Sequence, residues 1–493
     1  MRGDQRMKKY ILVFDLGTGN LRVAVTDTDG QVYAVQREDI IYETEQFIPR
    51  SLYFKPAVVW ERLVGLARKA VAQAGGVPIA AVTSTSQRQG IVLMDQAGNP
   101  FYGMPNIDHR SESIVNNYSA EVMHAIQERT ARTPSSLFSG SKLAYIFQHQ
   151  PDLWQRIQSF CSMSDWVGYM LSGRLVYEPS QATETLLYDV RRNEWSTELA
   201  DLLGLPSHIL PPLQEAGTVL GPIRKGVAEA LGISRDASVT VGAADTQAAI
   251  YHTSSRVDDV IIVSGTTTPV VQICDTYRAD ALHRSWTNSH VTPNRWILEA
   301  NCGVTGLNYQ HLKRVFYPSE PYDVMERELH SVEHQEVIAC MGTIRTDTDW
   351  GNSDLGGMIF KVPLAQQLSR AHFMLACIWD NACMIKSAMK VIDDAGGAQP
   401  AYIWGCGGGF QSIYYRKMLA SLLGKEIRIK PGYEQSSVLG AALLCTESLG
   451  LGSDTAVNSG YAATASNEMN RDDMYHRYDQ WLHWRSRIVV PGT

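Results

Sequence analysis

Short apolar runs that end at polar or glycine turns recur along the chain, and they predict buried strands. Tyr10–Phe14 ends at Asp15, and Leu21–Val25 alternates before Asp29-Gly30, a pair typical of a hairpin turn. The glycine turn between the two runs therefore connects antiparallel strands. A Rossmann or Walker phosphate loop opens a helix instead, so the pattern excludes both.

A helical spacing follows, and the first part of the chain then returns to strands. Val59, Leu63, Leu66 and Ala70 recur every three or four residues, and this predicts a helix that ends at Gly75-Gly76. The next predicted strands are Ile79–Ser84 and Gly90–Met94.

The second half of the chain repeats this order of strands and helices. The elements predicted there are the strands Val239–Gly242, Val260–Ser264, Pro269–Ile273 and Tyr402–Trp404 and the helices Leu368–Ala395 and Ser412–Leu423. The repeat predicts a duplicated α/β unit with a boundary near 246–258. We expect domains at 9–250 and 251–450, followed by a linker and a terminal helix over 451–493.

Composition narrows the class of protein. A chain of 493 residues is too long for one ordinary core, and 44% hydrophobic with 19% charged residues is typical of a globular protein. The net charge of -7 argues against nucleic-acid binding, and no run approaches the ~20 apolar residues of a membrane helix. Eight scattered cysteines indicate buried thiols rather than disulfides or zinc, and we expect a cytoplasmic protein.

The glycine turn after the first strand is a candidate phosphate site. Gly17 and Gly19 would expose successive backbone N–H groups, and Thr18 and Asn20 add short polar donors. Asp15 would repel a phosphate, so it would act through Mg²⁺. An ordinary hairpin whose aspartate caps the turn is the alternative.

Two glycine turns in the second half have a similar character. Gly265, Thr266 and Thr267 follow a strand and offer hydroxyls to a second phosphate, although such turns are more often only solvated. Gly405–Gly409 would let a flat purine approach closely, although a sharp turn between strand and helix needs glycine as well.

Asp245 is the candidate general base. Phosphoryl transfer to an alcohol needs an aligned hydroxyl and a group that accepts its proton, and one carboxylate at a strand end can do this. The alternative role is a helix N-cap for Thr246–Tyr251, which is compatible with the first.

A dense polar stretch between Ser84 and Arg110 could bind a polyhydroxylated ligand. Its candidate contact residues are Gln87, Arg88, Asp108 and Arg110. A surface ion pair between Asp108 and Arg110 is the alternative.

In this order, the elements resemble the FGGY family of carbohydrate kinases. Asp15–Arg22 and Ser264–Thr266 resemble its two phosphate motifs, and Gly242-x-x-Asp245 resembles its catalytic aspartate. The remaining matching segments are Gln87, Asp108-x-Arg110, Lys142-Leu143, Ser164–Gly173, Pro179–Ala182 with Asp189 and Trp195, Gly407–Ser412 and Glu434…Gly440–Ala442. The match spans residues 9–450.

The resemblance implies two actin-like (ribonuclease H-like) ATPase domains of α/β class with a central interdomain cleft. It implies ATP-dependent phosphorylation of a small sugar or polyol, with Mg²⁺ near Asp15 and Asp245. The residues implied to hold ATP are Gly17, Thr18, Gly19, Asn20, Arg22, Gly265, Thr266, Thr267, Gly407, Gly408, Gly409 and Ser412. A homodimer is common in such relatives, and no nucleic-acid or membrane partner is implied.

Several features favour the autoinducer-2 kinase branch, with xylulokinases and other pentulose kinases as close rivals. Asn106 stands where many members have Trp, and Gln247 follows Asp245 as it does in that branch. The branch also shares the runs Arg88–Leu93 and Asn288–Pro293. Gln247 therefore joins Gln87, Arg88, Asp108, Arg110 and Asp245 as a substrate contact.

Two segments depart from the family pattern in the second half. Met341–Arg345 with Asp347–Asn352 replaces a Ser-Gly-Glu-Arg-like stretch, and Arg370-Ala371 lacks the usual following glutamate.

A nucleotide-gated binding ATPase of the same fold is the rival of another class, and the Gln87–Arg110 stretch argues against it. A sugar-responsive regulator would need a helix-turn-helix, for which the first nine residues are too short.

Overall fold

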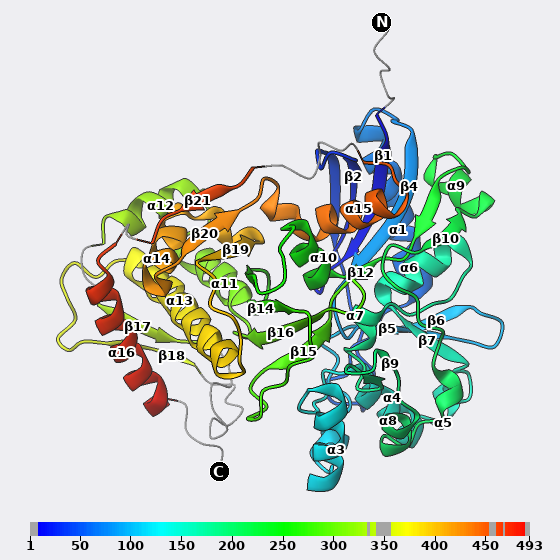
Figure 1. The fold of residues 1–493 in the computed structure, drawn as a ribbon, viewed down its shortest axis with the longest axis horizontal. Helices are drawn as coiled ribbons and strands as arrows, with labels where there is room; N and C mark the ends of the chain where they lie inside the picture. The colour runs from blue at the N-terminus through cyan, green and yellow to red at the C-terminus, as the bar shows by residue number, and fades with distance from the viewer. Residues whose placement is uncertain (1–7, 333–335, 342–355, 453–459, 467–468, 489–493) are drawn as a thin grey trace, which may run out of the picture. The chain divides into compact units, whose positions relative to one another are not determined.

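The computed structural model describes residues 8–332, 336–341, 356–452, 460–466 and 469–488, and it divides into two compact units (Figure 1). Of the described residues, unit 1 contains 8–254, 288–295 and 435–452, and unit 2 contains 255–287, 296–434 and the described residues from 460 onward.

The sheet of unit 1 is mixed and runs in the order β10-β11-β4-β1-β2-β3, with β12 also paired to β4. Its strands are β1 Tyr10–Leu16, β2 Asn20–Asp27, β3 Val32–Asp39, β4 Ile79–Ser86, β10 Val219–Pro222, β11 Ser238–Thr240 and β12 Ala243–Ala244. The β1–β2 and β2–β3 pairs are antiparallel, whereas β4 runs parallel to β1. The hairpin expected around the first glycine turn is confirmed.

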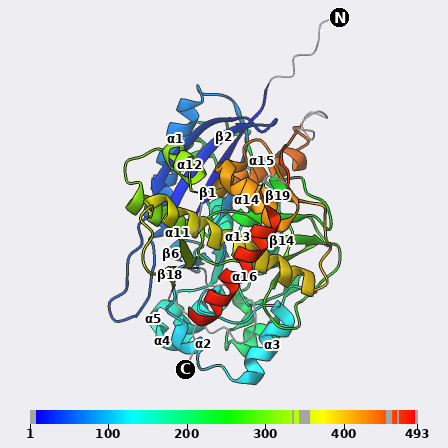
Figure 2. The same cartoon turned by 90° about the vertical axis from the view of Figure 1, so that its left-hand side faces the viewer.

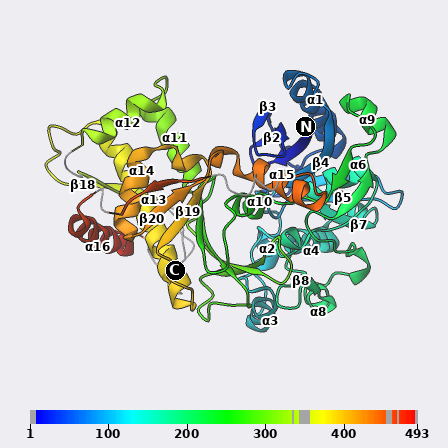
Figure 3. The same cartoon turned by 45° about the horizontal axis from the view of Figure 1, so that its top comes forward.

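Alternation along β1 explains why helices cover both faces of this sheet (Figure 3). Ile11 and Val13 belong to a cluster with Val438 of α15 Ser436–Ser448. The next side chain, Phe14, points to the other face and stacks on Trp60 of α1 Pro56–Gln73, with ring centroids 6.3 Å apart. A strand that is buried on both faces needs the continuous apolar run that the sequence shows.

The rest of unit 1 consists of short elements between β4 and α10. They are β5 Ile91–Met94, β6 Pro100–Met104, α2 Glu112–Val115, α3 Ala120–Thr130, α4 Ser139–His149, α5 Pro151–Trp154, β7 Ser159–Ser162, α6 Met163–Ser172, α7 Pro179–Ala182, β8 Tyr188–Asp189, β9 Glu194–Trp195, α8 Thr197–Leu202, α9 Lys225–Leu231 and α10 Asp245–His252. Among these, β6-β5-β7 form a small separate sheet.

Unit 2 repeats the strand order of unit 1 in a sheet of order β15-β16-β14-β13-β19-β20-β21. Its elements are β13 Val260–Val263, β14 Pro269–Cys274, β15 Trp286–Ser289, β16 Trp296–Asn301, α11 Gly306–Phe316, α12 Tyr322–His330, β17 Val337–Cys340, β18 Gly357–Phe360, α13 Arg370–Asp394, β19 Tyr402–Cys406, α14 Ile413–Leu423, β20 Glu426–Ile429, β21 Ala462–Thr464 and α16 Arg471–Ile488. The first strand is again antiparallel to the second and parallel to a later one, β19. The predicted duplication of an α/β unit is confirmed.

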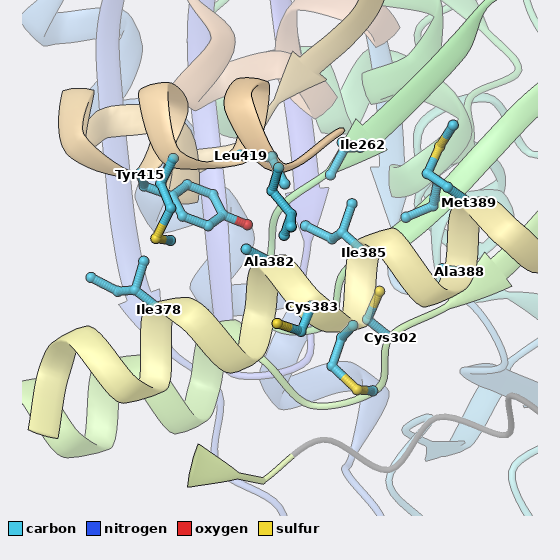
Figure 4. Packing of buried hydrophobic residues seen from close by; sticks show 14 of the residues in the cluster. Ile262, Cys302, Ile378, Ala382, Cys383, Ile385, Ala388, Met389, Tyr415 and Leu419 are labelled. Atoms are coloured by element: carbon cyan, nitrogen blue, oxygen red, sulfur yellow. The ribbon is translucent and has the colours of Figure 1, made fainter. Parts of the chain in front are cut away.

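The long helix α13 forms the centre of the unit 2 core. Ile378, Ala382 and Ile385 pack with Leu419 of α14, as Figure 4 shows. The terminal helix α16 lies beside α13 and α14 (Figure 2), and Trp481 donates its indole N–H to Asp380 of α13 at 2.8 Å. A buried aromatic side chain thus anchors the last helix.

The packing of α15 differs from the continuous domain ranges expected from the sequence. This helix follows unit 2 in the chain but belongs to unit 1, where it packs on α10 and β1. Gly440 allows the close approach, because a Cβ at this position would overlap the carbonyl oxygen of Ala248.

All eight cysteines are buried as free thiols, as expected. Among the described residues, no helix is both long and apolar enough to cross a bilayer.

Candidate active site

The end of β4 places two candidate site segments side by side in unit 1. The short strand β12 pairs with β4, with Ala244 opposite Ser86. Gly242 permits this pairing, because a Cβ there would overlap the backbone of Ser84. Asp245 follows β12, and Arg88 follows β4, so the fold brings them to the same edge of the sheet.

Asp245 has the electrostatic environment of a proton acceptor. It is only partly buried, yet desolvation, helped by the charge of Asp15, raises the pKa of Asp245 to about 6, while Arg88 acts in the opposite direction. A carboxylate with a pKa nearer neutrality accepts a proton more readily than an ordinary aspartate.

The expectation that Asp245 is the N-cap of the following helix is wrong, although its carboxylate bonds the backbone within the first turn. Asp245 is the first residue of α10, and Ala244 is the N-cap. The carboxylate accepts hydrogen bonds from the N–H of Thr246 at 2.6 Å and from its hydroxyl at 3.2 Å. The contacts orient the carboxylate and remain compatible with a role as general base.

Asp15 lies at the end of β1 and is buried. Arg22 is its partner across the antiparallel β1–β2 pair, and its Nη2 lies 2.8 Å from Asp15 Oδ2. Ser437 donates to the same oxygen at 2.8 Å, and Gln435 accepts from Arg22 at 2.7 Å. Sequence reasoning missed Gln435 and Ser437, although it included the neighbouring Gly440 in the family pattern.

The glycine turn between β1 and β2 offers fewer free donors than expected. The N–H of Gly17 closes the hairpin by donating to Asn20 O at 2.9 Å, so it is not available to a phosphate. Within the described chain, the N–H groups of Thr18 and Gly19 have no such bond. A Cβ added at Gly19 would meet open space. The accessible part of this turn is therefore Thr18-Gly19.

Gln87 holds this turn to the polar stretch rather than pointing freely outward. Its Nε2 donates to Gly17 O at 3.2 Å, and its Oε1 accepts from the N–H of Asn106 at 2.9 Å. Asn106 Nδ2 in turn donates to Thr18 Oγ1 at 2.9 Å. Because both polar atoms of the Gln87 amide are bonded to protein, Gln87 positions the turn and Asn106.

Asp108 and Arg110 form an ion pair, but it is buried, so the idea of a surface pair was wrong. Arg110 Nε lies 3.0 Å from Asp108 Oδ1, and both side chains are fully buried. Leu52 donates its N–H to Asp108 Oδ2 at 2.6 Å, and Glu45 lies 3.2 Å from Arg110. A buried pair with all these partners fixes the loop after β6.

In unit 2, the turn after β13 is braced by the start of α11. The N–H of Gly265 donates to Thr267 O at 3.0 Å, so this turn too uses one of its own donors. The N–H of Leu307 donates to Thr266 O at 3.2 Å. A side chain at Gly306 would overlap Gly265, so glycine is required there.

The glycine run after β19 packs directly on this turn. A Cβ at Gly407 or Gly409 would overlap Ser264, whereas a Cβ at Gly408 would meet open space. Gly405 is also packed, against the ring of Phe410, so protein packing by itself requires glycine at three positions of the run, and its role as a shelf for a purine stays a prediction. Ser412 caps α14 by accepting from the N–H of Tyr415 at 3.0 Å.

Comparison with known proteins now decides the family. The model of the "FGGY family of carbohydrate kinases, N-terminal domain" matches residues 10–251, and the C-terminal domain model matches residues 260–448. The chain belongs to the FGGY family of carbohydrate kinases. It is thus a phosphotransferase that acts on a sugar hydroxyl, and the two units have the actin-like ATPase fold.

Similar proteins support this assignment along nearly the whole chain. "Putative sugar kinase YoaC" of Bacillus subtilis (strain 168) is 44% identical over 457 residues, which cover 92% of this chain and 93% of that protein. "Autoinducer-2 kinase" of Escherichia coli (strain K12) is 26% identical and covers 91% and 88%. The crystal structure of ligand-bound xylulose kinase from Lactobacillus acidophilus has a TM-score of 0.83 at 17% identity, covering 98% and 99%, and supports the fold alone.

A buried lysine of this FGGY kinase donates hydrogen bonds to the backbone of the polar stretch. Lys142 donates to the carbonyl oxygens of Gln89, Pro105 and Asn106 at 3.2, 2.6 and 3.4 Å. Burial lowers the pKa of Lys142 to about 7, while Asp108 acts against this shift. Lys142 therefore ties the loop after β4 to the loop after β6.

Glu184 is the main feature of the site that sequence reasoning missed in this FGGY kinase. Its fully buried carboxylate forms ion pairs with Arg132 at 2.9 Å and with Arg88 at 3.4 Å. It also accepts a hydrogen bond from the side-chain amide of Gln89. Nothing local in the sequence marks Glu184, because its partners lie about 50 and 95 residues away.

Gln247 differs from Gln87 in having an unsatisfied amide. It is 1% exposed, and neither Nε2 nor Oε1 has a hydrogen-bond partner among the residues that the structure describes. A buried amide without a partner is costly, and a ligand hydroxyl would supply the missing bonds.

The departures that the sequence showed after Met341 lie largely outside the described residues. This applies to 342–355, which contain the rest of Met341–Arg345 and all of Asp347–Asn352. Arg370 is the first residue of α13 and pairs with Glu328 at 2.6 Å, and its neighbour Ala371 is buried. Among the described residues, no cluster of three metal-binding side chains occurs.

Proposed function

We propose that this chain transfers the γ-phosphate of ATP to a hydroxyl of a small ketose or polyol, with Asp245 as the base. The observation that carries the proposal is the environment of Asp245, whose pKa is raised to about 6 at the edge of the sheet beside Arg88. Asp245 would accept the proton of the acceptor hydroxyl, and Arg88 and Gln247 would orient that acceptor.

Asp15 and Asp245 fit a magnesium ion held partly through water. The charge of Asp15 raises the pKa of Asp245, so the two carboxylates are close enough to repel, and a cation would relieve this repulsion. Bound there, Mg²⁺ would neutralise charge on the phosphates of ATP. In unit 2, Gly408 and the Gly265–Thr267 turn would take the nucleotide, and in unit 1 the Thr18-Gly19 turn would take a phosphate.

The remaining proposals rest on the resemblance and on the relatives. We propose an acceptor like those of autoinducer-2 kinase or of xylulokinase and other pentulose kinases. We also propose a cytoplasmic enzyme that forms a homodimer. Asn106, which stands where many family members have Trp, would contribute to the choice of acceptor. Its Oδ1 is buried without a partner in the described structure and could accept a hydrogen bond from a hydroxyl of the acceptor.

The first test is release of ADP with a panel of acceptors: the linear autoinducer-2 precursor, D-xylulose, D-ribulose, L-xylulose, erythritol and glycerol. Turnover with one member well above the rate without a sugar would support the proposal and name the acceptor class. A flat panel with steady hydrolysis of ATP would favour the nucleotide-gated ATPase.

The role of Asp245 is tested by Asp245→Asn, which keeps the shape of the side chain but removes the proton acceptor. We expect kcat to fall by about 10³-fold or more, with little change in ATP binding measured by calorimetry. Asp95→Asn is the matched control, because this carboxylate also accepts backbone N–H bonds, from Ala97 and Asn99 in a surface turn. Substantial residual turnover of Asp245→Asn would remove Asp245 from the base role.

A further inference from the structure

Glu184 joins two guanidinium groups that arrive from different parts of unit 1. Its Oε1 lies 2.9 Å from Arg132 and 3.4 Å from Arg88, and its side chain is 0% exposed. Arg132 is also fully buried, and Arg88 is 8% exposed. Since Arg88 is the looser partner and the more exposed one, it is the cation of this cluster that can reach a ligand.

The cluster is held in place by the backbone around it. Gln89 adopts a left-handed conformation with a φ of +62°, which costs a non-glycine residue energy unless its surroundings impose it. Here its side chain bonds Glu184, and its carbonyl accepts from Ser139 and Lys142. This arrangement fixes the direction in which the preceding residue, Arg88, leaves the backbone.

A segment that runs from the last two residues of β15 to the residue before β16, and that belongs to unit 1, completes the cluster. Asn288 belongs to the residues 288–295 of unit 1, and its Oδ1 accepts from Arg132. His290 of the same segment lies near Tyr251 of α10, with ring centroids 6.4 Å apart. Gln247 is four residues before Tyr251 and so lies on the same helix face. Gln247 therefore shares a face of α10 with the residue that contacts this segment.

The cations around the proposed acceptor site of unit 1 are balanced by carboxylates of the protein itself. The ion pairs there are Arg22 with Asp15, Arg132 with Glu184, and Arg110 with Asp108 and Glu45. The charge of Arg88 is shared between Glu184 and Asp245, and Lys142 lies in the field of Asp108 with its ammonium bonded to backbone carbonyls. Each of these cations therefore already has a carboxylate beside it.

We propose that Glu184 is the residue that makes this site select uncharged polyhydroxy acceptors and reject sugar acids. The inference rests on the proposed function and adds the chemical class of its acceptor. A carboxylate brought into a buried site costs a large desolvation energy unless a cation is available to it. Because Glu184 and Asp245 together balance the charges of Arg88 and Arg132, no net positive charge is left for an acid, and hydroxyl groups remain the fitting ligands.

The wild-type enzyme gives the first test, because it needs no variant. Binding of matched pairs, such as xylitol with D-xylonate, erythritol with D-erythronate and D-glucitol with D-gluconate, is measured by calorimetry in parallel with the ADP-release panel. Each pair differs only in a terminal carboxylate. The proposal expects each acid to bind more weakly than its polyol, and an acid that binds as well as or better than its polyol would overturn it.

The second test is Glu184→Gln, which leaves Arg88 and Arg132 without their anion. The acids should then gain at least about tenfold in affinity relative to the polyols, because a charge-assisted bond to carboxylate becomes available. The double variant Glu184→Gln/Arg88→Gln also removes the cation that can reach the ligand, so the gain should disappear. Glu184→Asp keeps the charge and should not favour the acids.

The controls separate this proposal from the proposed function. Glu299→Gln replaces a buried carboxylate in unit 2 and should leave the ratio of acid to polyol affinity unchanged. If Glu184→Gln binds acids no better than the wild type does, the inference fails even where the panel shows kinase turnover. If the panel is flat but the ratio shifts as expected, the proposed function fails and the binding role of Glu184 stands.

Discussion

The buried carboxyl group of Glu178 should make the stability of unit 1 depend on pH. Glu178 is fully buried, and its Oε2 accepts from the hydroxyl of Ser180 and from the N–H of Gln181. Ser180 Oγ also accepts from the N–H of Ala244 at 3.1 Å, the residue before the proposed base. Burial, with the charge of Asp165 adding to it, raises the pKa of Glu178 from 4.5 to about 8.

The sign and size of the effect follow from this shift. Between about pH 5 and pH 8 the folded chain keeps the Glu178 proton, whereas the unfolded chain has lost it. The contribution of Glu178 to the free energy of unfolding therefore falls as pH rises, by about 1.4 kcal/mol per pH unit. From pH 5 to pH 8 the loss should approach about 4 kcal/mol.

The measurement compares urea unfolding of the wild type and Glu178→Gln at each pH from 5 to 8, and the difference in unfolding free energy is plotted against pH. Titrating groups that do not interact with Glu178 cancel in this difference. Between pH 5 and pH 8, the unfolding free energy of Glu178→Gln should rise relative to that of the wild type by about 4 kcal/mol. Glu198→Gln, at an exposed glutamate paired with Arg129, should show a flat difference. A flat difference for Glu178→Gln as well would refute the buried, protonated carboxyl.

Three further perturbations test other parts of unit 1. Gly440→Ala should destabilise the chain by about 1–3 kcal/mol, seen as a lower Tm, because the added Cβ overlaps Ala248, whereas Gly19→Ala should leave Tm almost unchanged. Lys142→Met should raise KM for the acceptor by about tenfold and leave KM for ATP unchanged, since it frees both loops of the polar stretch; equal changes in both would contradict this. Asp15→Asn should raise the Mg²⁺ concentration needed for half-maximal rate by about tenfold or more, and an unchanged Mg²⁺ curve would exclude Asp15 from the metal site.

The strands and helices could be predicted because their signals are local. The run Tyr10–Phe14 and the glycine turn after it lie within one hairpin, and the helical spacing that ends near Gly396 became α13. Even here the internal bond of Gly17 was not foreseen, because a glycine pattern does not say which N–H groups the turn itself uses.

The missed parts of the site depend on contacts between distant segments. Glu184 meets Arg88 and Arg132 only when the chain between α7 and β8 folds back on β4. Ser437 reaches Asp15 from more than 400 residues away. Neither contact has a spacing or composition that a single sequence reveals.

The position of α15 in the chain has a consequence for biosynthesis. Unit 1 begins at the N-terminus, but Ser437, which bonds Asp15, emerges from the ribosome only after the whole of 255–434. At typical rates of translation this takes roughly 10 to 40 s, during which the apolar face of β1 that Val438 covers is exposed on the nascent chain. A chain stalled or cut within unit 2 would thus release an incomplete first unit, a natural client for chaperones and proteases rather than a half-active enzyme.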